Sequence, residues 1–148
     1  MEFISIILIL GLIIIDIIMV ERDISEGKIW EFWIMLFLIN SVLFSMLVLG
    51  NDARFIFKWG FISLAFLTFT ELLGTMFNKA EKSSIGGADI FFIISMSMIV
   101  GHYFLYMLLG AYFTQILLWL IGFKGAKECR FIPILSVWAG FLAIFLLL

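Results

Sequence analysis

Four carboxylic acids are the side chains of this sequence best suited to chemistry. Asp16 and Glu71 lie inside long apolar segments, whereas Asp23 and Asp89 lie where apolar segments meet polar ones. Ionisable groups are costly inside a membrane, so acids in such segments suggest function. Two carboxyl groups held together share one proton, so one can accept a proton from water while the other protonates the attacked carbonyl oxygen. These acids therefore favour two-carboxylate hydrolysis of a peptide bond, without a metal or a cofactor.

The other reactive side chains support weaker hypotheses. Cys129 and His102 are expected on opposite sides of a membrane, so we predict neither a Cys–His pair nor a serine activated by histidine. One cysteine also excludes internal disulfides and a cysteine-based zinc site. No basic cluster indicates a nucleic-acid partner. For the acids, the simplest alternative is that Asp23 is a solvated loop residue and Asp89 an acid that favours a helix N-terminus.

The composition determines what must hold these acids. Hydrophobic residues make up 65% of the 148 residues and charged residues only 14%, against about 25% charged in a soluble domain. The mean hydropathy is +1.25. The sequence therefore predicts an all-α integral membrane protein, a bundle of about six transmembrane helices that forms a single membrane-embedded domain over residues 1–148.

Six segments approach the length of about 20 apolar residues that crosses a bilayer. We separate the fourth from the fifth at Gly101–Tyr103, because together they are too long for one crossing. Four glycines, Gly60, Gly74, Gly110 and Gly140, are expected to allow close helix packing. The predicted spans are 3–20, 30–50, 55–77, 85–101, 102–122 and 131–148.

Basic residues indicate the orientation. The segments 21–29, 78–84 and 123–130 would lie on one side of the membrane and hold seven basic residues, whereas the other side holds only Arg54 and Lys58. By the positive-inside rule, the first side faces the cytoplasm and both termini face outward across the plasma membrane. Asp23 and Asp89 are then expected at the same cytoplasmic face. The seven basic residues are Arg22, Lys28, Lys79, Lys82, Lys124, Lys127 and Arg130.

The stretches around two of the acids resemble a known family. "GGAD", formed by Gly86, Gly87, Ala88 and Asp89, resembles the GxGD motif of membrane-embedded aspartyl peptidases. "DISEGKIWE", which begins at Asp23, is similar to the pattern after the first span of type IV prepilin peptidases, above all the short archaeal members. In that pattern Lys28 takes a position that is commonly basic. The closing segment "RFIPILSVWAGFLAIFLLL" is also similar.

The resemblance implies a function and a site. Asp23 and Asp89 would be the catalytic acids, and Gly86, Gly87 and Ala88 would form a loop that lets the substrate backbone approach. The substrate would be a prepilin or pre-archaellin precursor, whose short basic leader precedes an apolar helix. The family's larger members carry a four-cysteine zinc domain linked to N-methylation. This chain has one cysteine, so we expect cleavage without methyl transfer.

Some features leave alternatives open. Trp30 and Glu31 stand where the family has Pro-Asn, so Asp16, seven residues before Asp23, remains a competitor for the first acid. Glu71 is expected to form a structural hydrogen bond, to pair with Asp16 or to tune the dyad. A small transporter or channel that uses Asp16 and Glu71 is a different class of function. A non-catalytic pilus assembly factor of the same fold is a third.

Overall fold

The computed structural model describes residues 2–26, 29–78, 87–121 and 131–147. This part of the chain is all-helical and contains no strand, which confirms the predicted fold class. One short 3-10 helix, η1, joins α4 to α5. The elements are α1 (Glu2–Glu26), α2 (Glu31–Leu47), α3 (Ala53–Asn78), α4 (Gly87–Val100), η1 (Gly101–Tyr103), α5 (Phe104–Leu120) and α6 (Phe131–Leu147).

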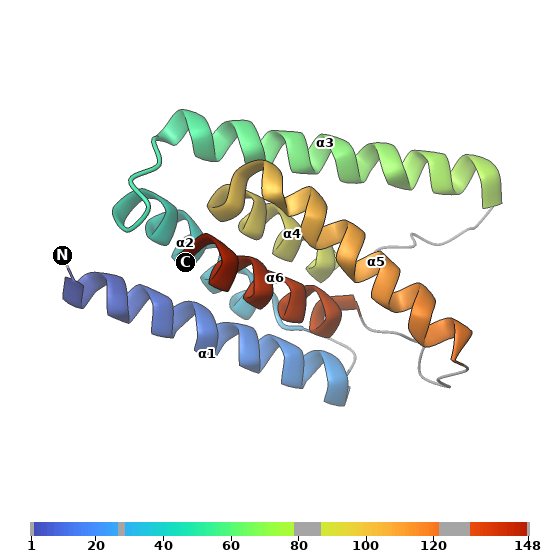
Figure 1. The fold of residues 1–148 in the computed structure, drawn as a ribbon, viewed down its shortest axis with the longest axis horizontal. Helices are drawn as coiled ribbons and strands as arrows, with labels where there is room; N and C mark the ends of the chain where they lie inside the picture. Colours follow the sequence, from blue (N-terminus) through green and yellow to red (C-terminus); the bar gives the residue numbers. More distant parts are fainter. Residues whose placement is uncertain (1, 27–28, 79–86, 122–130, 148) are drawn as a thin grey trace.

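Successive helices run in opposite directions, so the bundle has two distinct ends (Figure 1). The start of α1 and the finish of α6 lie together at one end. At the other end α1, α3 and α5 finish while α2, α4 and α6 begin. We call the second end the Asp89 end, because Asp89 belongs to the first turn of α4.

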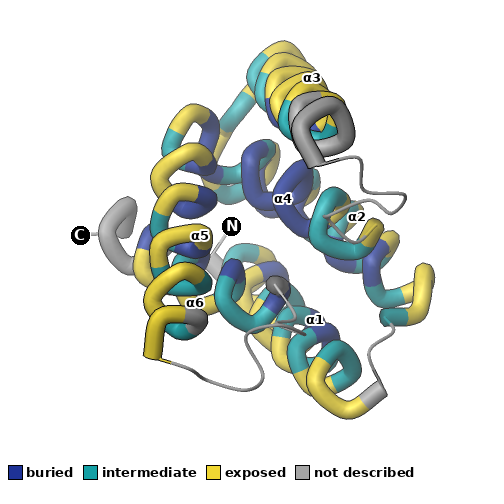
Figure 2. The backbone as a smooth tube through the Cα atoms, turned by 90° about the vertical axis from the view of Figure 1, so that its right-hand side faces the viewer, coloured by how far each residue is buried: buried dark blue, intermediate teal, exposed yellow. Residues whose placement is uncertain are grey.

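Helix α4 is the centre of the bundle. It packs against α2, α3, α5 and α6, and Figure 2 shows its buried stretch surrounded by the other helices. Its core residues include Phe92, which stacks on Phe37 of α2 with ring centroids 5.1 Å apart. Residues Phe92 to Ser97 and Val100 of α4 are buried, whereas Phe91 near its start is 44% exposed. The helix that carries Asp89 therefore has little surface left for solvent or lipid.

The predicted break between α4 and α5 is confirmed. Gly101 has φ +60°, a left-handed conformation that glycine adopts without strain from a Cβ atom. A Cβ at this position would also lie 2.9 Å from Cζ of Phe55. The chain therefore reverses at Gly101, and α5 returns toward the Asp89 end (Figure 1).

Three helical stretches are long and apolar enough to cross a membrane: Phe3–Ser25, Ala53–Leu72 and Gly87–Leu118, the last of which includes the Gly101 reversal. Glu31–Leu47 and Ile132–Leu142 are shorter apolar helices. Length and composition thus support a membrane protein.

The first helix is longer than the sequence predicts. We expected a span over 3–20 followed by a connecting segment that carries Asp23, but α1 continues to Glu26. No glycine or proline interrupts residues 21–26, and Glu, Arg and Ser are compatible with a helix. Asp23 is therefore a helical residue rather than a loop residue.

Candidate functional site

Asp89 lies on the inward side of α4. Ile93, Met96 and Val100 follow it by four, seven and eleven residues and are all buried, and this spacing keeps residues on one face of a helix. Its position in the first turn of α4 also places a negative charge beside the positive end of the helix dipole. The structure therefore orients a carboxyl group toward the bundle interior at the Asp89 end.

The expected glycine loop before Asp89 is only partly described. Gly87 and Ala88 are the first residues of α4, so they belong to a helical turn and not to a loop, whereas Gly86 lies outside the described residues. No described atom lies within 4 Å of a Cβ added to Gly87. Packing against the described residues therefore does not require glycine at this position.

Asp23 lies near the end of α1, four residues after the fully buried Met19. Its Oδ2 atom is enclosed by protein. The neighbouring Arg22 holds its guanidinium 5.4 Å from the ring centroid of Trp30, a cation–π contact that ties α1 to the residue before α2. Asp23 is thus held on the inward side of α1 at the Asp89 end.

The two expected catalytic acids share an end of the bundle and a set of neighbours. Helix α1 packs against α2 and α6, and α4 packs against the same two helices. Helices α1 and α4 do not pack along their lengths. Asp23 and Asp89 therefore lie at the same end of the bundle, on two helices that share α2 and α6 as neighbours.

Asp16 has a different environment. It is seven residues before Asp23 in the same helix, which corresponds to about 10 Å along the axis. The hydroxyl of Ser136, from α6, donates a hydrogen bond to its Oδ2, while Oδ1 is buried without a hydrogen bond. Both residues border an open groove of about 450 Å³, with Ile17, Val20, Glu21, Ile24 and Ser25.

Glu71 does not pair with Asp16, which corrects that expectation. Its helix, α3, lies on the opposite side of the bundle from α1 (Figures 1 and 2), and the two helices do not pack along their lengths. Instead, α3 packs against α4, and the contact between Ser63 and Ser97 sets Glu71 at about the same level along the bundle as Asp89. The phenol of Tyr112 is within electrostatic range of both carboxyl groups. These three side chains come from α3, α4 and α5.

Sequence reasoning missed Tyr112 and Ser136. A signal for Ser136 was present, because it is the only hydroxyl residue in the closing segment 130–148. Tyr112 is one of three tyrosines, and nothing in its local sequence distinguishes it from the other two. Lys28, predicted at a commonly basic position, and Cys129 lie outside the described residues. Within those residues, no group of three or more His, Cys, Asp and Glu side chains could hold a metal ion.

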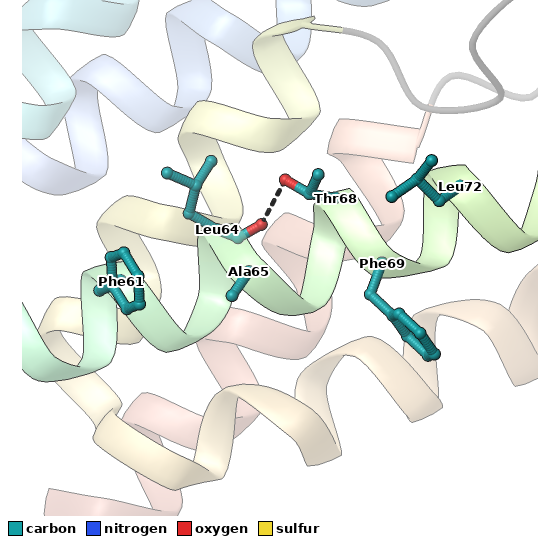
Figure 3. A pocket seen from close by; sticks show the side chains of 6 residues that line it. All are labelled: Phe61, Leu64, Ala65, Thr68, Phe69 and Leu72. Atoms are coloured by element: carbon teal, nitrogen blue, oxygen red, sulfur yellow. Dashed lines mark hydrogen bonds between the residues drawn. The ribbon is translucent and has the colours of Figure 1, made fainter.

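A separate pocket of about 360 Å³ lies along α3 and has no catalytic group (Figure 3). Its lining residues all belong to that helix. The one polar side chain, Thr68, donates a hydrogen bond of 2.8 Å to the carbonyl of Leu64. The pocket is therefore an apolar hollow on one helix. It is lined by Phe61, Leu64, Ala65, Thr68, Phe69 and Leu72.

Comparisons with protein-family models, with curated proteins and with solved structures find no match to this chain.

Proposed function

We propose that the protein is a membrane aspartic endopeptidase, which removes the short basic leader from prepilin-like or pre-archaellin precursors. One observation carries the proposal. Asp23 and Asp89, the two acids that the family pattern selects, lie at the same end of the bundle on the inward sides of α1 and α4. A two-carboxylate mechanism needs two acids within reach of one bound water, and a common end is the first condition for this.

In the mechanism, one carboxylate accepts a proton from the attacking water. The other, protonated, donates its proton to the carbonyl oxygen of the scissile bond as the tetrahedral centre forms. Gly87 and Ala88, which precede Asp89 in the first turn of α4, carry little or no side chain and so let an extended substrate strand approach Asp89. No methyl transfer accompanies cleavage.

The proposal includes an orientation. The six helices each cross the plasma membrane, with both termini outside and the Asp89 end at the cytoplasmic face. The substrate's apolar helix then lies in the bilayer beside the bundle, and its basic leader lies in the cytoplasm. Cleavage takes place between them, at the depth of Asp23 and Asp89. The clustering of basic residues in the segments at this end supports this orientation.

A transporter or channel is less well supported. That function would need Asp16 and Glu71 to line one polar path. Their helices lie on opposite sides of the bundle, and each acid has its own surroundings, Ser136 in one case and Tyr112 in the other.

Co-expression with a tagged prepilin, read as a shift on a gel, tests the proposal. Asp23→Asn and Asp89→Asn should each abolish cleavage, because asparagine keeps the shape of aspartate but cannot exchange the proton. Asp52→Asn is the matched control. Asp52 accepts a hydrogen bond of 2.7 Å from the Phe55 amide at the start of α3, and asparagine caps a helix equally well.

Three outcomes would contradict parts of this assignment. Full cleavage by either catalytic variant removes that residue from the mechanism. An inactive Asp16→Asn beside an active Asp23→Asn makes Asp16 the first acid. Absence of cleavage by the wild-type protein, with the precursor present in the same membrane, rejects the peptidase and favours an assembly factor.

A further inference from the structure

The register of α3 against α4 brings Glu71 level with Asp89. The hydroxyls of Ser63 and Ser97 are 2.9 Å apart across these two helices. Glu71 lies eight residues after Ser63, and Asp89 lies eight residues before Ser97. Because the helices run in opposite directions (Figure 1), both acids lie about 12 Å from the serine contact, in the same direction along the axis.

The rotation of α3 about its axis places Glu71 on the face that packs against α4. Gly60 faces α4, because a Cβ there would be 2.7 Å from Cε of Met98. Glu71 follows Gly60 by eleven residues, which is close to three full helical turns. Leu67, between them on this face, is 2% exposed. Glu71 therefore continues the side of α3 that packs against α4.

Helix α5 carries Tyr112, which we place beside Glu71 and Asp89. Its first residue, Phe104, contacts Phe66 of α3 edge to face, with ring centroids 6.3 Å apart, and α5 runs in the same direction as α3 (Figure 1). Tyr112 is therefore somewhat nearer the Asp89 end than Glu71. Long side chains on a helix point back toward its N-terminus, which directs the phenol toward the level of the two acids. The electrostatic interaction of Tyr112 with both acids agrees with this placement.

We propose that Tyr112 is a positioning residue for Asp89, and that its hydroxyl donates a hydrogen bond to the Asp89 carboxyl group in the working enzyme. This inference rests on the proposed peptidase function. Two carboxylates level with each other on packed helices repel, and the repulsion is stronger where water is scarce. A phenol is a neutral donor, so it holds Asp89 in one orientation beside Glu71 without introducing a charge.

A double-mutant cycle tests the contact without relying on cleavage. Tyr112→Phe, Asp89→Asn and the double variant are purified in detergent, and the free energy of unfolding of each is measured. The ring is retained in Tyr112→Phe, so the fold should survive. We expect the change in the free energy of unfolding of the double variant to differ from the sum of the two single changes, by more than the scatter seen for independent pairs. Tyr106→Phe is the matched control, because Tyr106 is on the same helix, is 63% exposed and should combine additively with Asp89→Asn. Additive effects at Tyr112 overturn the inference, whether or not the protein is a peptidase.

Cleavage kinetics then test the role. Tyr112→Phe should lower kcat by roughly 10- to 100-fold with KM little changed, which corresponds to the loss of a hydrogen bond to a charged group. Tyr106→Phe should cleave like the wild type. If the wild type cleaves the precursor and Tyr112→Phe cleaves it equally fast, the inference is overturned and the proposed function stands. No cleavage by the wild type rejects the proposed function instead, and the double-mutant cycle still decides whether Tyr112 contacts Asp89.

Discussion

Gly110 of α5 has the closest packing of any described glycine. A Cβ at this position would lie 2.5 Å from Cδ2 of Trp138 in α6, with two more indole atoms at 2.6 Å. The indole is also fixed by its own hydrogen bond, because Nε1 donates to Oγ1 of Thr114 at 3.0 Å. A rigid, anchored ring cannot move aside as a flexible side chain can. Glycine at 110 therefore sets the distance between α5 and α6.

Gly110→Ala should destabilise the protein by about 1–3 kcal/mol, the usual cost of overpacking a tight contact. The free energy of unfolding in detergent measures this change. Gly140→Ala is the matched control, because no described atom lies within 4 Å of a Cβ built at Gly140 and alanine favours a helix more than glycine does. Equal stability of Gly110→Ala and the wild type would show that α6 can move away from α5 at little cost.

The predicted close packing at glycines can be compared with the structure. The expectation is confirmed at Gly110 and at Gly60, whose Cβ would contact Met98. At Gly140 the described residues do not support it, because none of their atoms lies within 4 Å of a Cβ built there. The surroundings of Gly74 lie outside what the structure describes. Nothing in the spacing of the glycines distinguishes these cases, because the partner helix decides which face is crowded.

At the scale of the elements, α1 is joined to its neighbours by polar contacts. The side-chain amide of Asn40 in α2 donates to the carbonyl of Leu8 at 3.1 Å, and Ser136 of α6 donates to Asp16. Most of the remaining surface of α1 is apolar and exposed. In a lipid environment, where the hydrophobic effect does not drive helices together, such polar contacts help to hold one helix against another.

Ser136→Ala should therefore loosen α1 from α6. The change leaves the buried Asp16 carboxyl group without its donor, which costs about 1–3 kcal/mol in the free energy of unfolding. Ser95→Ala is the control, because the Ser95 hydroxyl donates within its own helix, to Phe91 at 2.8 Å, and makes no hydrogen bond to a second helix among the described residues. Leader cleavage should persist in Ser136→Ala. A loss of cleavage in a folded Ser136→Ala protein would contradict a purely structural role for the Asp16–Ser136 contact.

At the scale of the whole molecule, serines join the central helix to two of its neighbours. Ser45 of α2 donates to the carbonyl of Met98 at 2.6 Å, and Ser97 of α4 lies against Ser63 of α3. Together with the stacked rings of Phe37 and Phe92, these contacts fix α4 in depth and rotation. The orientation of Asp89 therefore depends on one contact within a turn of it, at Phe92, and on the serine contacts more than two turns away.

The orientation of the whole bundle can be tested with the native thiol. Cys129, the only cysteine, belongs to the segment 123–130 that we assign to the cytoplasm. A membrane-impermeant thiol reagent should leave it unlabelled in intact cells and should label it after the cells are broken. Asn51→Cys in a Cys129→Ser background is the matched control, because Asn51 connects α2 to α3 at the other end of the bundle and should react from outside. The reverse labelling pattern would invert the proposed topology.

The amino-acid sequence by itself determined the helices and their order along the chain. Apolar runs separated by charged segments predict helices locally, and Gly101 marks the reversal between α4 and α5 because its conformation is a property of glycine. The alternation of direction then follows, and with it the common end of Asp23 and Asp89. The end of α1 was less predictable, because residues 21–26 are polar and yet helical.

Only the tertiary structure decided which helices are neighbours. Apolar residues cover most of each helix, so the sequence gives no clear sign of which face meets which partner. The lateral arrangement separates Glu71 from Asp16, gives Asp16 the hydroxyl of Ser136 and packs the helix of Glu71 against the helix of Asp89. These contacts depend on side chains far apart in the sequence that fit together in three dimensions, which no local pattern contains.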